Sequence, residues 1–195
     1  MIWNRKTLAG LFVVATSLMS GAASAQGYVG VAVGSTKWSS VCWGENRCSS
    51  GTTTKLTAGY TLDKNFAIEG SIYSLGNYSN QLTASNFSQS VKGKGNGVSF
   101  AGVFNYEFSQ DFSGFAKLGI ASMHRDVAWN TASASSTPVI ASEVRNSTQA
   151  VLGLGVKYKL NDRVSLTLEL EQYRSRYNLN KPEVRTVTTG VQFAF

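Results

Sequence analysis

Several residue types that carry catalysis or metal binding are scarce in this sequence of 195 residues. It has one histidine, two cysteines and two prolines, and charged residues make up only 15% of it. These are too few ligands for a zinc site, so we expect no metal and no other cofactor. The net charge is +7, but the lysines and arginines are scattered and form no basic run. Their distribution argues against nucleic-acid binding and favours contact with anionic lipid head groups or polysaccharide.

Long apolar runs are also missing, except at the N-terminus. A short basic head, an apolar stretch over residues 8–19 and the small-x-small triplet Ala23–Ala25 are typical of a secretory signal peptide. The apolar stretch is shorter than the roughly 20 residues that a membrane-spanning helix needs. We therefore expect residues 1–25 to be cleaved and residues 26–195 to form one exported domain without a transmembrane helix.

The two cysteines, Cys42 and Cys48, follow the predicted signal peptide and are close together in the sequence. In an oxidising, exported environment such a pair most simply forms a disulfide. We therefore predict a disulfide that closes a small loop.

The mature chain alternates apolar with small or polar residues over eight segments, which is the period of β-strands with two unlike faces. The segments cover residues 27–35, 54–62, 66–76, 97–108, 112–123, 148–160, 164–173 and 187–195. Three short polar turns alternate with four long links, which we expect to be loops: residues 36–53, 77–96, 124–147 and 174–183. Neither proline falls within an expected strand. Short turns at one end and long loops at the other are typical of outer-membrane barrels.

The composition of the two faces indicates which one is inside. The small or polar face is rich in Gly, Ala, Ser and Thr, as suits a narrow lumen, whereas a soluble exterior would carry more Lys and Glu. The apolar face places aromatic residues beside the short turns or the C-terminus: Tyr60, Phe66, Tyr106, Phe108, Phe112, Tyr158, Phe193 and Phe195. They form an interfacial girdle in the manner of membrane barrels. The sequence thus predicts an all-β protein, an eight-stranded antiparallel up-and-down transmembrane β-barrel, with its last strand pairing to residues 28–35.

Some charged residues fall on the predicted inner face. Glu69, Lys117, Lys157 and Glu169 lie about 3–6 residues from a short turn, so they share one layer of the lumen. Isolated charges in a narrow lumen are costly, so we predict a salt-bridge network that Glu171 and Lys55 join from higher up. The alternative interpretation of these charges is a narrow gated ion pore.

Several segments of this chain resemble the small outer-membrane β-barrels of the OmpA transmembrane-domain and OmpX type. The similar segments are residues 59–69, 106–112, 116–119, 153–158, 161–162 and 190–195. The resemblance implies residence in the outer membrane of a Gram-negative cell, and assembly by the barrel-assembly machinery through the terminal aromatics Phe193 and Phe195. It also places Glu69 at an acidic gate position, but Lys157 stands where that family has an acid, so the gate is not carried over intact.

The single histidine, His124, lies near Asp126, and such a pair resembles part of the site of outer-membrane lipid A-modifying enzymes. The His-x-Ser pattern of the deacylases is absent because Asp126 occupies the third position, which favours a surface histidine. We therefore expect no enzyme. We expect a monomer in contact with outer-membrane lipid and lipopolysaccharide, whose long loops meet host or environmental surfaces in adhesion or envelope integrity. An ion pore and a lipid A-modifying enzyme remain the two alternatives.

Overall fold

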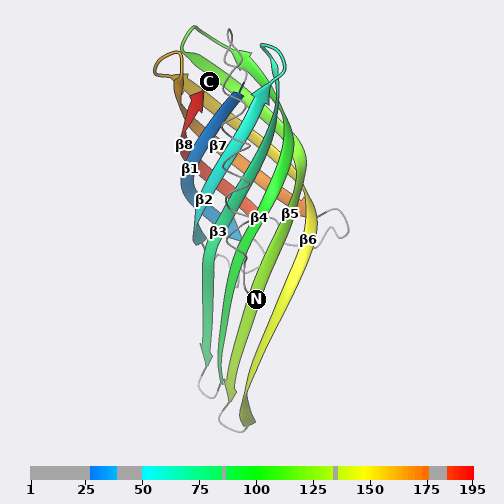
Figure 1. The fold of residues 1–195 in the computed structure, drawn as a ribbon. Coiled ribbons are helices and arrows are strands. Elements are labelled where there is room, and N and C mark those ends of the chain that lie inside the picture. Colours follow the sequence, from blue (N-terminus) through cyan, green and yellow to red (C-terminus); the bar gives the residue numbers. More distant parts are fainter. Residues whose placement is uncertain (1–26, 39–49, 85–86, 134–135, 176–183) are drawn as a thin grey trace, which may run out of the picture.

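A computed structural model of the chain shows eight strands that close into a single barrel (Figure 1). The structure describes residues 27–38, 50–84, 87–133, 136–175 and 184–195. The strands are β1 (Gly27–Trp38), β2 (Ser50–Thr61), β3 (Phe66–Ala84), β4 (Phe87–Glu107), β5 (Phe112–Ser133), β6 (Ser136–Lys159), β7 (Val164–Ser175) and β8 (Val184–Ala194). The described residues include no helix long and apolar enough to cross a membrane. The predicted signal peptide, residues 1–25, and Cys42 and Cys48 lie outside the described residues.

The apolar face of the barrel points outward, as the alternation predicts. On β1, the valines Val29, Val31 and Val33 are 45–54% exposed. Tyr28, which points into the lumen, is only 7% exposed. The same pattern continues around the barrel, for example at Leu118, which is 66% exposed. A continuous outward band of large apolar side chains would be unstable in water and suits lipid. The prediction of a transmembrane barrel is confirmed.

The barrel closes through antiparallel pairing of β1 with β8, with Val31 opposite Val191. At the end of this ladder the Phe195 amide donates a hydrogen bond to the Gly27 carbonyl over 2.9 Å. Closure leaves the barrel wall without an edge strand, which a hydrocarbon environment requires because it offers no water to unpaired backbone groups. The predicted pairing of the C-terminal strand is therefore confirmed.

One end of the barrel, here called the turn end, carries three tight turns between β2 and β3, β4 and β5, and β6 and β7. The Asp63 carboxylate accepts hydrogen bonds from the amides of Asn65 and Phe66 over 2.7 and 2.9 Å. Asn161 caps the third turn in the same way. These local side-chain bonds are the reason that Asp and Asn specify such turns. The short turns lie where the sequence predicts them.

At the opposite end, here called the hairpin end, the structure corrects the sequence prediction. Two of the expected loops, residues 77–96 and 124–147, are largely strand, and together they form a sheet that continues β3–β6 beyond the barrel (Figure 1). We call this sheet the extension. Apolar residues such as Val127 and Val144 are scattered among its many polar ones, so the sustained alternation that reveals the barrel strands is missing, and backbone pairing defines its strands.

Two irregularities accompany the extension. Gly76 has a φ of 69° at the shift of register between Ser74 and Asn77, a conformation that favours glycine, and it lies where β3 leaves the barrel. Pro138, expected outside the strands, instead lies within β6, next to a second shift of register between Thr131 and Ser133. A proline is tolerated there because a bulge, and an outer edge with which no strand of the described residues pairs, need fewer backbone donors.

Candidate functional site: the barrel lumen

A layer of charged side chains crosses the middle of the lumen. Its members come from four strands, β2, β3, β5 and β7, and all are almost fully buried, with exposures of 3–6%: Lys55, Glu69, Lys117, Glu169 and Glu171. We call these five residues the charged layer. Strand alternation alone directs each of them inward, and the stagger of the strands brings them to one level.

The ion pairs of the charged layer are continuous. Lys117 Nζ pairs with Glu69 Oε1 and lies 2.7 Å from Glu169 Oε1. Lys55 Nζ pairs with Glu169 Oε2 and lies 3.1 Å from Glu171 Oε1. Glu169 therefore joins the two lysines. Because each lysine contacts two carboxylates, part of the cost of removing these charges from water is offset by Coulomb attraction in a low-dielectric interior.

Two buried tyrosines complete the hydrogen bonding of the carboxylates. The Tyr28 hydroxyl donates to Glu69 Oε2 over 3.0 Å, and the Tyr173 hydroxyl donates to Glu171 Oε2 over 3.0 Å. Gly59 makes room for the first of them, because a Cβ there would overlap the Tyr28 ring. Sequence reasoning missed both tyrosines. Their signal is an aromatic side chain on a face otherwise small or polar.

Lys157, which the sequence places with these charges, lies nearer the turn end and does not join their ion pairs. Its Nζ is 5.6 Å from the centre of the Tyr28 ring and 5.9 Å from that of Phe115, within reach of cation–π attraction. With Lys157, the charged side chains in and beside the charged layer are three Lys and three Glu, whose formal charges cancel. A cavity of about 40 Å³, lined by Lys157 together with Glu69, Lys117 and Glu169, has room for water.

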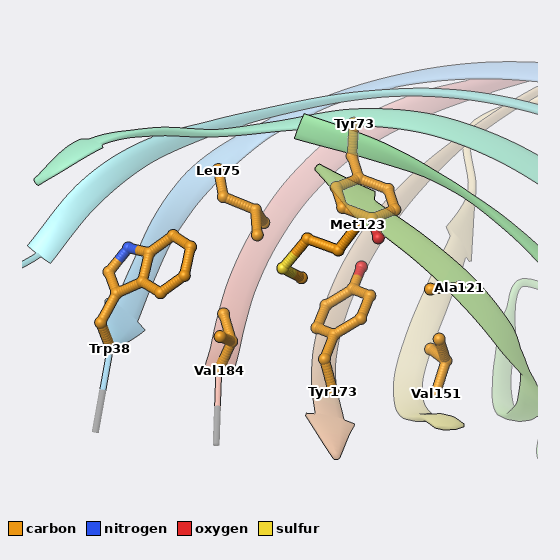
Figure 2. Close-up of a cluster of buried hydrophobic side chains, with 8 residues drawn as sticks. All are labelled: Trp38, Tyr73, Leu75, Ala121, Met123, Val151, Tyr173 and Val184. Carbon is orange, nitrogen blue, oxygen red and sulfur yellow. The ribbon is translucent and has the colours of Figure 1, made fainter. Parts of the chain in front are cut away.

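Toward the hairpin end, the lumen is filled by apolar and aromatic side chains (Figure 2). This plug consists of Trp38, Tyr73, Leu75, Ala121, Met123, Val151, Tyr173 and Val184. The rings of Tyr73 and Tyr173 approach within 5.2 Å, and Arg125 lies 5.1 Å above the Trp38 ring. The sequence predicts a small and polar lumen; here its outer part is apolar and tightly filled instead.

His124 lies on the outward face of β5, where the extension begins. Its Nδ1 lies 2.6 Å from Asn146 Oδ1, and its Nε2 lies 3.3 Å from Asp126 Oδ1. Both ring nitrogens thus have a polar neighbour, and neither of these neighbours is a serine. The described residues also contain no cluster of potential metal ligands. This arrangement provides hydrogen bonding between neighbouring strands, with neither ring nitrogen directed at a nucleophile.

The C-terminal aromatics Phe193 and Phe195 lie on the outward face at the turn end, 41% and 39% exposed. Replacing Phe195 with serine is expected to lower, several-fold, the amount of folded barrel in the outer membrane, because the residue proposed as the assembly signal would be lost. The measurement is the heat-modifiable gel band in the membrane fraction. The control is Phe100→Ser, which removes a mid-strand aromatic that is 57% exposed. Equal losses from both variants would mean that position 195 has no special role.

Comparisons with known proteins agree with this architecture. The outer membrane protein beta-barrel domain family matches residues 7–195. Comparison with curated proteins finds no match. Among solved structures, Ail, the attachment invasion locus protein of Yersinia pestis, has a TM-score of 0.55 at 15% identity, covering 89% of this chain and 100% of Ail. Its complex with the heparin analogue sucrose octasulfate gives 0.51 at 15% identity, with 87% and 99% covered.

The N-terminal barrel domain of OprF from Pseudomonas aeruginosa has a TM-score of 0.54 at 15% identity, covering 87% of this chain and 98% of that domain. At these identities the likeness to solved structures concerns the fold. The family match, in contrast, covers nearly the whole chain. The protein therefore belongs to the outer membrane protein β-barrel domain family.

Proposed function

We propose that this protein is a non-enzymatic, monomeric surface protein that uses the extension to contact partners outside the cell. The observation that carries the proposal is the shape of the extension, a four-stranded sheet in which β3–β6 project beyond one side of the barrel (Figure 1). A barrel needed only for envelope integrity would not require such a sheet. Export by the signal peptide of residues 1–25, assembly by the barrel-assembly machinery and a Cys42–Cys48 disulfide belong to the same proposal.

The two sides of the extension end in strand edges. In the described part of the chain, no strand pairs with residues 78–84 of β3 or with residues 136–148 of β6 on their outer sides. An unpaired edge presents backbone donors and acceptors that can bind an extended peptide as an added strand. The proposed partner is therefore a polypeptide segment that adds a strand to one of these edges.

One face of the extension carries a groove of about 470 Å³. Its lining combines polar residues, among them Asn77, Lys92, Lys94 and Asp126, with the apolar residues Val127, Ala128 and Val144. The groove offers hydrogen-bond donors and acceptors next to the edges, as an adaptable binding surface does. A barrel of the same fold is an attachment protein in Yersinia pestis, which supports a surface role without identifying the partner.

The test removes the extension and keeps the barrel. Asn77 is directly opposite Lys94, and Asp126 is directly opposite Val144, so each pair can be joined by an Asn-Gly turn. Cells that express this variant are expected to bind a panel of immobilised extracellular-matrix proteins about tenfold more weakly. Such a change corresponds to a loss of about 1.4 kcal/mol in binding free energy. The barrel should still show heat-modifiable migration, because its ladders remain complete.

A matched control separates backbone pairing from side-chain contacts. The double variant Lys92→Gln and Lys94→Gln keeps both edges and changes only charges on the exposed face of β4. It should bind as well as the unmodified protein if edge pairing dominates. Unchanged binding after removal of the extension would contradict the proposed function.

A narrow ion pore is the second candidate, because the charged layer and the cavity beside Lys157 form a polar path from the turn end. A mouth of about 250 Å³ opens that end of the lumen. Conduction would also require passage through the apolar plug at the hairpin end. We therefore rank this function below surface binding.

A further inference from the structure

Basic side chains gather on one outward face of the barrel at the hairpin end. Lys37 of β1, Arg185 of β8 and Arg174 of β7 are all exposed, and they come from three consecutive strands. Alternation directs each of them away from the lumen, because their neighbours Trp38, Val184 and Tyr173 are fully buried. These three residues are called the basic rim below.

Two residues of the basic rim are direct neighbours. Lys37 lies opposite Arg185 in the ladder of β1 and β8, and Gln172 lies opposite Arg185 in the ladder of β7 and β8. Directly opposed residues in antiparallel strands have Cβ atoms about 4.5–5.5 Å apart, and like charges at this spacing repel. Arg174 follows Gln172 by two positions and so points to the same side. An anion between these side chains would relieve the repulsion.

The charge of this face is not balanced by nearby acids on the same strands. In the described parts of β1, β7 and β8, the only acidic residues are Glu169 and Glu171, and both point into the lumen. Arg185 also has an interaction partner within the protein, so what the rim offers is a concentration of positive charge. Such a concentration attracts polyanions at short range.

The basic rim lies at the border of the apolar band. On the same face toward the turn end, Val187 lies one step from Arg185 and is 43% exposed. Leu170 lies two steps from Arg174 and is 56% exposed. Val33 on β1 is 52% exposed and lies two steps from Lys37. A lipid whose chains cover these residues places its head group at the level of the basic rim. The turn end of the same barrel has aromatic residues at the corresponding border.

We infer that the basic rim binds a phosphate group of a phosphorylated glycolipid in the outer leaflet of the membrane. Arginine binds phosphate through two parallel hydrogen bonds, lysine adds a point charge, and the Gln172 amide can hydrogen-bond a sugar hydroxyl. The apolar surface below holds the acyl chains of the same molecule. The proposal is independent of the extension, which lies on β3–β6.

The test compares lipid binding by three forms of the full mature chain, each folded in detergent micelles. The first is unmodified, the second carries Lys37→Gln, Arg174→Gln and Arg185→Gln, and the third carries Lys64→Gln, Lys159→Gln and Arg163→Gln at the turn end. Both variants lose three positive charges. Native mass spectrometry counts the bound lipid, with diphosphorylated lipid A, the same lipid after removal of both phosphates, and inorganic phosphate as probes.

The unmodified protein is expected to bind the diphosphorylated lipid at least about tenfold more tightly than the dephosphorylated one. A roughly tenfold difference in affinity is what one good charged hydrogen bond contributes. The basic-rim variant should lose this preference, and the turn-end variant should keep it within about twofold, as expected for screened surface charges. High salt should weaken the preference.

Three results would overturn the inference: no preference for phosphate in the unmodified protein, equal loss in both variants, or displacement of the lipid by inorganic phosphate at similar concentration. The last would indicate a site for free anions. If the triple variant does not fold, as judged by heat-modifiable migration, the single variant Arg174→Gln is used, and it should reduce the preference by about threefold. An unchanged preference in that variant would equally count against the site.

Discussion

Replacing Lys117 with methionine is expected to lower the free energy of unfolding of the barrel by about 3–5 kcal/mol, the usual effect of removing one partner from a buried ion pair. Lys117 contacts both Glu69 and Glu169, and Glu169 retains Lys55 when Lys117 is gone. Glu69 loses the one ion pair that the described residues give it and keeps only hydrogen bonds from Tyr28 and Ser71. A buried carboxylate without a counter-charge is the source of the loss.

The measurement is urea-induced unfolding in lipid vesicles, followed by the heat-modifiable gel shift. The double variant Lys117→Met and Glu69→Gln removes both charges, so it should lose less stability than the sum of the two single variants. Lys64→Gln, at an exposed turn, serves as the control and should change stability by no more than about 0.5 kcal/mol. Additive losses in the double variant would mean that the two residues do not interact as the structure shows.

Replacing Trp38 with alanine is expected to have the second large effect, because Trp38 is 1% exposed and fills the outer part of the lumen (Figure 2). Loss of a buried tryptophan costs about 3–5 kcal/mol through lost burial and the cavity left behind. It also removes the ring that Arg125 covers. In planar bilayers the unmodified protein should give no discrete conductance steps, whereas Trp38→Ala combined with Tyr173→Ala should give small ones.

The lipid-facing variant Phe100→Ala is the control, because Phe100 is 57% exposed on the outer wall and does not line the lumen. It should leave the bilayers silent. Discrete steps from the unmodified protein, altered by Lys117→Met, would instead favour the ion-pore function over the surface role. Conductance therefore separates the two candidate functions without a known partner.

The sequence was most informative where a local physical rule determines the conformation or orientation of each residue. A strand alternates its side chains, so the outward positions of Val31, Leu118 and Phe193 followed from their spacing alone. Asp63 and Asn161 marked the short turns because their side chains bond to the backbone two and three residues on. Closure of β8 on β1 followed from the need to pair every backbone group in hydrocarbon.

The extension escaped prediction because its strands mix apolar and polar residues without a sustained alternation. Backbone hydrogen bonds between β3 and β4, and between β5 and β6, are nearly independent of side-chain type, so residues such as Asn77 and Asn130 fit a strand without leaving a period in the sequence. The same absence of pattern in the sequence is typical of a loop. Only the continued register distinguishes the two.

The sequence by itself determined the barrel, its inner and outer faces, its turn end and the residues that carry charge into the lumen. The tertiary structure decided which of those residues meet. Lys117 reaches Glu69 and Glu169 across the lumen, whereas Lys157 lies beside Tyr28 and Phe115. Contacts across a barrel depend on the tilt and stagger of eight strands, and alternation along one strand carries no information about either.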